Sequence, residues 1–463
     1  MARYPPRVDG DQRETPLAGS PGVPFGEAAR FWVKLGFVNF GGPAGQIALM
    51  HHELVERKRW IGERRFLHAL SYCTLLPGPE AQQLAIYVGW LLHRTPGGLV
   101  AGVAFILPAF FLMMGLAWTY AAHGDVAWVS SVFAGLAAAV VGVVAVAVIG
   151  LARRAVRGLA LAGIAVSAFA AIHVVGIPFP FVVAGAALAG VVLRAMPAAH
   201  GAQEEAADGG GAAISDETVA APHTRPSWRR SARVLAIGLA VWWLPLLAVV
   251  AWRGSGGTLS TEAFFFSKAA VVTFGGAYAV LAYLKQAAVV QYGWLSAGDM
   301  AAGLGLAEST PGPLIMVTEF VGYVAAYRFP GGLDPALAGA LGALVTTWAT
   351  FAPCFLWIFL GAPYVERLRG NRTLGSALAG VMASVVGVIA SLALSFGSSV
   401  LFERTTSVQP FAAPIQIPVW STVDAFAVAL AVAAAVAVHR LRISVVWVVL
   451  AAAALGWLRS LVR

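Results

Sequence analysis

Long apolar stretches, separated only by short polar turns, run along most of the chain. Eight of them are close to the roughly 20 residues that a helix needs to cross a bilayer. They cover residues 99–121, 126–150, 158–175, 178–195, 335–362, 373–397, 421–438 and 442–459. A further apolar stretch covers 231–252. The pattern predicts an all-α polytopic membrane protein.

Other apolar elements are interrupted where a membrane helix would otherwise continue. Pro77-Gly78-Pro79 and Pro311-Gly312-Pro313 each place two prolines around a glycine. Proline removes a backbone donor and clashes with the preceding turn, and glycine adds backbone freedom, so a helix must break there. Phe40-Gly41-Gly42 and Phe274-Gly275-Gly276 mark a second kind of break. Each half of the chain therefore contains two broken helices.

The breaks recur at one spacing, since 311 − 77 = 234 and 274 − 40 = 234. Lys34 and Trp60 also return 234 residues later, as Lys268 and Trp294. The chain is therefore a duplicated unit. We expect a disordered cytoplasmic tail, a first repeat, a disordered cytoplasmic linker, a connecting transmembrane helix and a second repeat. Their bounds are 1–24, 25–195, 196–230, 231–252 and 262–463.

The basic loops change places between the two copies. Arg57–Arg65 is rich in cations, whereas its counterpart near 291–299 is poor in them. Conversely, 174–180 has no Lys or Arg, and its counterpart carries Arg440 and Arg442. Positive loops stay on the cytoplasmic side, so the second repeat is predicted to have inverted topology. This arrangement gives a cytoplasmic N-terminus and a periplasmic C-terminus.

The flanking charges also bear on how the broken helices cross. Arg57–Arg65 and Arg94 lie on either side of one broken element, and both have the character of cytoplasmic charge. A re-entrant hairpin tipped by Pro-Gly-Pro brings both flanks to one side, and its irregular backbone must then be covered by protein or a cavity. The alternative is a full crossing that leaves one basic loop on the opposite side.

Composition narrows the function. Of the 463 residues, 59% are hydrophobic and 11% are charged, against roughly 25% charged residues in soluble domains. The net charge of +9 is typical of cytoplasmic anchoring loops and does not indicate nucleic-acid binding. The two cysteines lie in apolar segments, and no motif indicates a metal site, a cofactor or a catalytic nucleophile. We therefore expect a transporter and not an enzyme.

Helices that begin inside the membrane point unpaired N–H groups and part of a positive charge into the protein, which is an anion site built from backbone. Lys34 and Lys268 could balance a bound anion, or they could extend to the membrane interface from short helices. The predicted substrate-binding residues are Lys34, Asn39, Gly41, Gly42, Pro77, Gly78, Pro79, Gln82, Lys268, Thr273, Gly275, Gly276, Thr310, Pro311, Gly312 and Pro313.

Three carboxylates near the breaks are candidates for proton coupling. Glu80 directly follows the first Pro-Gly-Pro turn at a helix start. Glu308 precedes the second turn by three residues, and Glu319 follows it by six. The repeat counterpart of Glu80 is Leu314, so the two halves are not chemically equivalent.

With Phe40-Gly41-Gly42-Pro43, residues 76–85 (Leu-Pro-Gly-Pro-Glu-Ala-Gln-Gln-Leu-Ala) and Thr310-Pro311-Gly312-Pro313, the chain resembles the chromate ion transporter family. It is similar to the long, two-domain members over residues 25–460, apart from the linker. The resemblance implies export of chromate from the cytoplasm across the inner membrane, with resistance as the result. It also implies that sulfate, a similar tetrahedral dianion, competes.

Other interpretations stay open at the level of the sequence. The same site would suit a carrier or uptake system for sulfate or another oxyanion, or an anion channel. A chromate-reducing enzyme is disfavoured because no cofactor motif supplies electrons. The expected partners are the lipid bilayer, the transported anion and, in a homodimer, a second copy of the chain. The small-residue faces at 134–142 and 377–387 could pack within one chain or in a homodimer.

Overall fold

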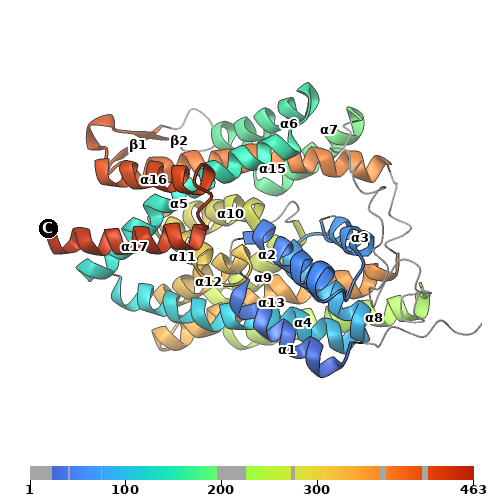
Figure 1. Ribbon diagram of the computed structural model, residues 1–463. Coiled ribbons are helices and arrows are strands. Elements are labelled where there is room, and N and C mark those ends of the chain that lie inside the picture. Colours follow the sequence, from blue (N-terminus) through green and yellow to red (C-terminus); the bar gives the residue numbers. More distant parts are fainter. Residues whose placement is uncertain are drawn as a thin grey trace, which may run out of the picture.

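The computed structural model describes residues 23–39, 42–74, 76–124, 126–194, 226–272, 277–364, 372–408 and 415–462. The predicted tail (1–24) and linker (196–230) lie outside the described residues, apart from 23–24 and 226–230. The described chain is almost entirely helical, and its elements form one bundle (Figure 1). The predicted all-α polytopic membrane architecture is confirmed.

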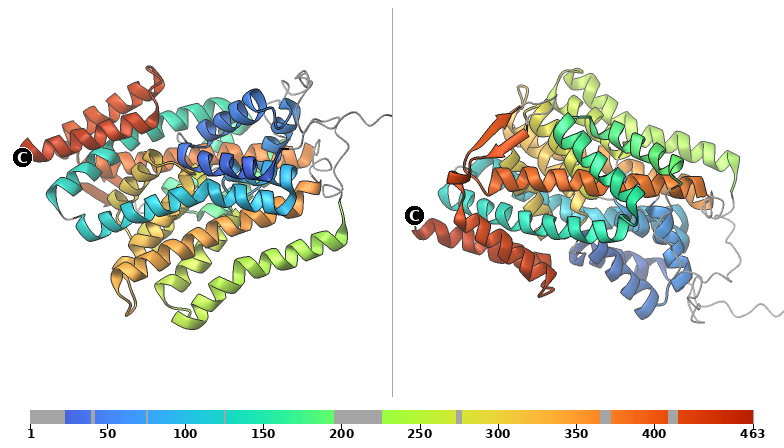
Figure 2. Two further views of the ribbon diagram at one scale, coloured as in Figure 1. Left: turned by 60° about the horizontal axis from the view of Figure 1, so that its bottom comes forward. Right: turned by 90° about the horizontal axis from the view of Figure 1, so that it is seen from above.

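Among the described residues, the first half contains seven α-helices and two π-helical turns. They are α1 (Phe25–Val38), α2 (Gly42–His51), η1 (His52–Arg57), α3 (Glu63–Cys73), α4 (Glu80–His123), α5 (Ala127–Ala155), α6 (Leu159–Ala170), η2 (Ala171–Val175) and α7 (Phe179–Val192). The connecting helix α8 (Trp228–Arg253) lies along one edge of the bundle (Figure 2).

The second half follows the same plan. Its elements are α9 (Thr258–Val272), α10 (Ala277–Lys285), η4 (Gln286–Gln291), α11 (Ala297–Ser309), η5 (Leu314–Met316), α12 (Val317–Arg328), α13 (Pro335–Gly361), η6 (Ala362–Tyr364), α15 (Arg372–Val400), β1 (Thr405–Val408), β2 (Ile415–Pro418), η7 (Trp420–Thr422), α16 (Ala425–His439) and α17 (Val445–Val462).

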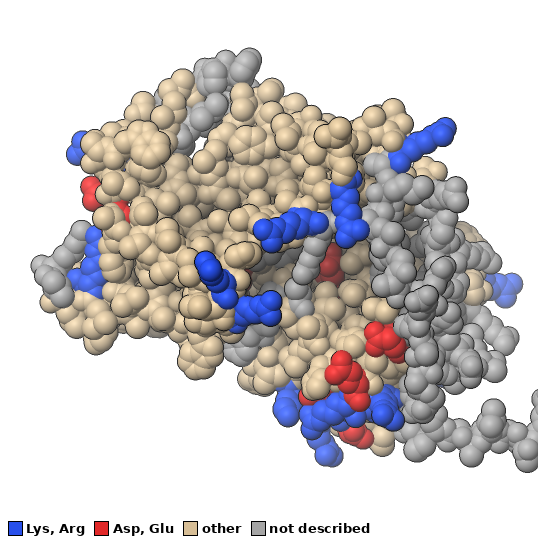
Figure 3. Space-filling view, turned by 45° about the horizontal axis from the view of Figure 1, so that its top comes forward, with Lys and Arg blue, Asp and Glu red and all other residues tan. Residues whose placement is uncertain are grey.

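Five helices among the described residues are long and apolar enough to cross a membrane, namely α4, α5, α8, α13 with the adjoining turn, and α15. Shorter apolar helices cover Leu159–Val175, Phe179–Val192, Ala425–His439 and Val445–Leu461. The face shown in Figure 3 is mostly uncharged, and its acidic and basic side chains gather in a few places. Such a surface suits contact with lipid.

The first broken element of each copy doubles back on itself. In the first copy, Lys58 after η1 forms an ion pair with Glu27 at the start of α1, with 3.0 Å between Nζ and Oε1. The rings of Phe31 and Trp60 lie 5.1 Å apart. In the second copy Phe265 and Trp294 repeat this contact at 6.3 Å. Both residues are shifted by 234, because 265 − 31 = 294 − 60 = 234.

The Pro-Gly-Pro elements double back as well. In the first copy, Tyr72 of α3 and Tyr87 of α4 bring their rings to 6.0 Å although 15 residues separate them. In the second copy, Arg328 at the end of α12 forms an ion pair with Asp299 at the start of α11, at 2.7 Å. The two arms of each element therefore lie side by side, as a hairpin requires.

The chain reverses again within α4, at His93 and Arg94. The backbone there is not helical, and Arg94 has a φ of +55°. Beyond the turn the chain runs back so closely that a Cβ on Gly97 would collide with the carbonyl oxygen of Gly89. Residues 80–92 and 95–123 are thus two helices that pack backbone to backbone, which only small residues allow.

The long helices of the two copies exchange partners. Helix α5 packs against α16 and α17 of the second copy, and α15 packs against α6 and α7 of the first (Figures 1 and 2). Gly142 of α5 meets Ala431, and Gly387 of α15 meets Ala165, each with no space for a Cβ. The small-residue faces pack within one chain.

One region of the second copy contains a small sheet. Helix α15 continues to Val400, and β1 pairs antiparallel with β2, with Thr405 opposite Pro418. The β-branched residues in Thr405–Val408 and Ile415–Pro418 favour strands.

Candidate functional site

The first Pro-Gly-Pro turn is held by a side chain from the helix that follows it. Gly78 has a φ of +116°, a conformation that side-chain-bearing residues rarely adopt. The amide Nε2 of Gln83 donates to the carbonyl oxygen of Pro77 at 2.7 Å. A Cβ on Gly78 would lie 3.0 Å from Sγ of Cys354, which belongs to α13 of the second copy. The turn therefore rests on the long helix of the other repeat.

The second Pro-Gly-Pro turn repeats this arrangement in the opposite sense. Gly312 has a φ of +115°, and a Cβ there would overlap Cβ of Ala109 in α4 of the first copy. Each turn thus lies against the second helix after the equivalent turn in the other copy. The two contacts are therefore reciprocal, and each turn is packed against the opposite repeat.

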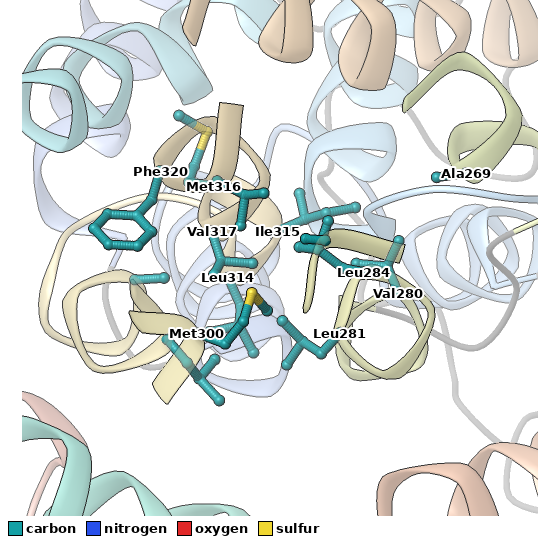
Figure 4. Packing of buried hydrophobic residues seen from close by; sticks show 14 of the residues in the cluster. Ala269, Val280, Leu281, Leu284, Met300, Leu314, Ile315, Met316, Val317 and Phe320 are labelled. Carbon is teal, nitrogen blue, oxygen red and sulfur yellow. The ribbon is translucent and has the colours of Figure 1, made fainter. Parts of the chain in front are cut away.

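The residues after the second turn are packed among apolar side chains. Leu314, Ile315 and Val317 lie against Val280 and Leu281 of α10, and the side chains are all buried (Figure 4). The helix start that follows Pro313 is therefore enclosed by hydrocarbon. Glu80, at the equivalent position of the first copy, is only half-buried. The two helix starts differ in polarity and in exposure, as the sequence indicated.

A polar contact joins the first break of one copy to the second break of the other. The backbone N–H of Gly312 donates to the carbonyl oxygen of Asn39 at 3.2 Å. Nε2 of Gln46, in α2, donates to the same oxygen at 2.9 Å and also to the carbonyl oxygen of Gly312. All three residues are buried. Two breaks that lie 273 positions apart, since 312 − 39 = 273, therefore meet at one point.

The remaining polar candidates near the turns are buried but weakly bonded. Nε2 of Gln82 lies 3.5 Å from the carbonyl oxygen of Gly102, and Oγ1 of Thr310 lies 3.4 Å from that of Ala307. Oδ1 of Asn39 and Oε1 of Gln82 have no hydrogen-bond partner among the described residues. A buried polar atom without a partner is costly, so these amides are candidates for contact with a polar solute.

Four predicted site residues lie outside the described residues: Gly41, Thr273, Gly275 and Gly276. Gly42 begins α2, as its predicted place after a break requires. Pro77, Pro79, Pro311 and Pro313 are buried with their turns.

The candidate carboxylates lie in different surroundings. Glu319 is fully buried in α12, and neither of its carboxylate oxygens has a hydrogen-bond partner among the described residues. Glu308 is also buried, near the end of α11. Glu80 begins α4 and keeps partial exposure. A buried carboxylate without a bonding partner is expensive as an anion, so such groups favour the protonated form and are candidates for carrying protons.

The two lysines are not among the buried turn residues. Lys34 and Lys268 both have exposed side chains, on the outer sides of α1 and α9. The opposite face of α1 carries its buried residues, which include Trp32 and Leu35. In this conformation neither lysine lies with the buried polar groups beside the turns, and the role of the lysines as counter-ions stays a prediction.

Two buried polar residues were missed by the sequence analysis. Gln46 joins the breaks, and Glu262 in α9 is fully buried with both carboxylate oxygens unpartnered among the described residues. Their repeat counterparts are the apolar residues Val280 and Ala28, since 280 − 46 = 262 − 28 = 234. The signal that could have identified them is a polar residue at a position whose repeat counterpart is apolar.

No group of three or more His, Cys, Asp or Glu residues with the arrangement of a metal site occurs within the described ranges. The fold and the site define a helical membrane transporter in which paired broken helices face long helices of the opposite half.

A model of the chromate transporter family matches residues 26–191 and 261–457, and the chain belongs to this family. A chromate transport protein of Pseudomonas aeruginosa is 31% identical over 434 residues, which cover 93% of this chain and 91% of the relative. One from Cupriavidus metallidurans is 29% identical, over 81% of this chain and 84% of the relative.

A probable chromate transport protein of Synechococcus elongatus is 28% identical, over 83% of this chain and 88% of the relative. No solved structure matches the chain significantly. Membership of the family places the protein among membrane transporters of chromate.

Proposed function

We propose that the protein exports chromate from the cytoplasm across the inner membrane as a secondary active transporter and so gives chromate resistance. The observation that carries the proposal is the reciprocal packing of the two Pro-Gly-Pro turns, each against a long helix of the other copy. Broken helices at corresponding positions of two halves are the usual place of a transporter's central site. Rocking of one half against the other would expose that site to each side in turn.

Inverted topology of the two repeats is part of this proposal. The matched contacts of α5 with α16 and of α15 with α6, and the exchange of basic loops, support it. The ranges matched by the family model fall one on each copy. The N-terminus would then be cytoplasmic and the C-terminus periplasmic, and the broken elements would be re-entrant hairpins.

The substrate site would be formed by the helix starts and the amides around the turns. Helix N-termini offer unpaired N–H groups to a dianion, and Asn39 and Gln82 offer amide donors. Sulfate has the same tetrahedral shape and charge as chromate, so it would compete. Lys34 and Lys268 would enter only if the transport cycle brings them inward.

Proton coupling would be carried by Glu80, with Glu319 and Glu308 as the other candidates. Glu80 begins a helix beside the first turn and is half-buried, so it can meet both the substrate site and solvent. Entry of a proton on Glu80 would drive the departure of the dianion, because both movements carry positive charge into the cytoplasm, down the membrane potential. The expected result is that Glu80→Gln abolishes the pH dependence of transport but leaves the helical fold intact.

The experiment is chromate uptake by everted membrane vesicles, with and without a proton gradient and with sulfate as competitor. Accumulation that requires the gradient and is inhibited by sulfate supports a coupled exporter. Uptake in right-side-out vesicles alone would identify an importer. Gradient-independent current through purified protein in planar bilayers would identify a channel. Full pH-dependent transport by Glu80→Gln would exclude Glu80 as the coupling group.

A further inference from the structure

A pocket of about 240 Å³ opens between the two arms of the first hairpin. Its walls come from α1 on one side and from α2 and η1 on the other. It is lined by Glu27, Arg30, Phe31, Lys34, Leu35, Val38, Leu49, Glu53, Arg57 and Lys58. It lies on the protein surface, because Arg30, Lys34 and Arg57 are exposed. It is distinct from the buried turns described above.

The pocket carries an excess of positive charge, with four cations against two carboxylates. Both carboxylates are already used. Glu27 pairs with Lys58 at 3.0 Å, and Glu53 pairs with Arg57 at 2.8 Å. Arg30 and Lys34 lie one turn apart on α1, and neither has an ion-pair partner among the described residues. The two unpaired cations therefore present adjacent donors to an anion.

The inner end of the pocket is apolar. Val38 and Leu49 lie there, close to the break between α1 and α2. Beside the pocket, Val33 and Phe37 of α1 are also exposed. Cationic groups at one end of the site and exposed hydrocarbon at the other match an amphiphile whose charged end lies outward. Basic pockets between transmembrane helices on the cytoplasmic side bind the head groups of anionic lipids.

We propose that this pocket binds an anionic phospholipid. The phosphate contacts Arg30 and Lys34, and an acyl chain lies along Val38, Leu49 and the exposed side of α1. A free inorganic dianion would gain from the cations but nothing from the apolar end. A zwitterionic lipid would gain from the apolar end, but its own cation would meet the unpaired Arg30 and Lys34.

The second copy provides an internal comparison. Position 264, the counterpart of Arg30, is Phe264, and position 291, the counterpart of Arg57, is Gln291. Lys268 alone is kept as the counterpart of Lys34, and it is likewise exposed. Lys268→Gln therefore removes an equivalent exposed charge without touching the pocket, which makes it the matched control.

The test is native mass spectrometry of the purified full chain titrated with dioctanoyl phosphatidylglycerol. Dioctanoyl phosphatidylcholine, glycerol 3-phosphate and chromate serve as comparison ligands. The expected result is preferential retention of phosphatidylglycerol by the wild type. In Arg30→Gln/Lys34→Gln the dissociation constant should rise about 30-fold, from about fivefold for each lost cation. Lys268→Gln should leave it unchanged.

The charge-preserving variant Arg30→Lys/Lys34→Arg should retain phosphatidylglycerol, which guards against misfolding of the neutral variant. Equal retention of phosphatidylcholine would overturn the proposal, since it would mean unspecific lipid contact. Competition by glycerol 3-phosphate or chromate at the same concentration as the lipid would overturn it in favour of a simple anion site. Unchanged binding in the neutral variant, or an equal loss in Lys268→Gln, would also overturn it.

Discussion

Replacing Gly312 by alanine tests the contact between the second turn and the opposite repeat. The substitution has two costs. The φ of +115° is unfavourable for any residue with a Cβ, at about 1–3 kcal/mol. The new methyl group would also overlap Cβ of Ala109, and overpacking of this kind costs about 1–3 kcal/mol. Together, about 2–6 kcal/mol of stability is lost, a large part of the usual total.

Two companion variants separate these costs. Gly332 has a φ of +86° with no atom within 4 Å of an added Cβ, so Gly332→Ala carries the backbone cost alone. Ala109→Gly removes the methyl group that Gly312→Ala would meet. By itself it costs about 1 kcal/mol because glycine is a poor helix residue. In the double variant it should restore about 1–3 kcal/mol, which is a favourable coupling between the two positions.

The assay is heat denaturation of the purified protein in detergent, followed by loss of the monodisperse peak in size-exclusion chromatography. We expect Gly332→Ala to melt slightly below the wild type and Gly312→Ala well below it. The double variant with Ala109→Gly should melt above Gly312→Ala. If the shifts of Gly312→Ala and Ala109→Gly simply add, the two residues are not in contact and the reciprocal packing of turns and helices is refuted.

Two further predictions concern the contacts between the copies. Gly142→Leu and Gly387→Leu should each lower the melting temperature sharply and to a similar extent, because each glycine touches a backbone carbonyl of the opposite copy. Gly150→Leu and Gly163→Leu, with no atom within 4 Å of the Cβ position, should change the melting temperature little. An equal loss in these controls would contradict the packing of α5 and α15 against helices of the opposite copy. Gln46→Ala removes two hydrogen bonds at the joined breaks and should cost about 1–3 kcal/mol in the same assay. An unaltered melting temperature would show that Gln46 does not hold the breaks together.

The sequence predicted the helices well because apolar length and proline or glycine breaks act locally. The two breaks at Gly78 and Gly312 have the positive φ that only glycine adopts readily. The repeat offset even predicts a contact between side chains, since the pair Phe31–Trp60 returns as Phe265–Trp294. The aromatic residues and breaks that the two copies share therefore give the same hairpin twice.

The orientation of single side chains was harder to predict. In α1 the buried residues at 28, 31, 32 and 35 share one face, so Lys34 falls on the other side. Helical periodicity alone therefore indicates that Lys34 is exposed, whereas its recurrence as Lys268 suggested a role at the site. The link from Gln46 to Gly312 could not be predicted, because it depends on how the two copies pack and not on either copy alone.

The exchange of partners between α5 and α15 has a consequence for the order of folding. Helices α6 and α7 leave the ribosome long before α15, against which they finally pack, because about 180 residues lie between them. Until then their apolar surfaces must be covered by lipid or by the insertion machinery. The first half of the protein therefore reaches its native packing only when synthesis of the second half is nearly complete.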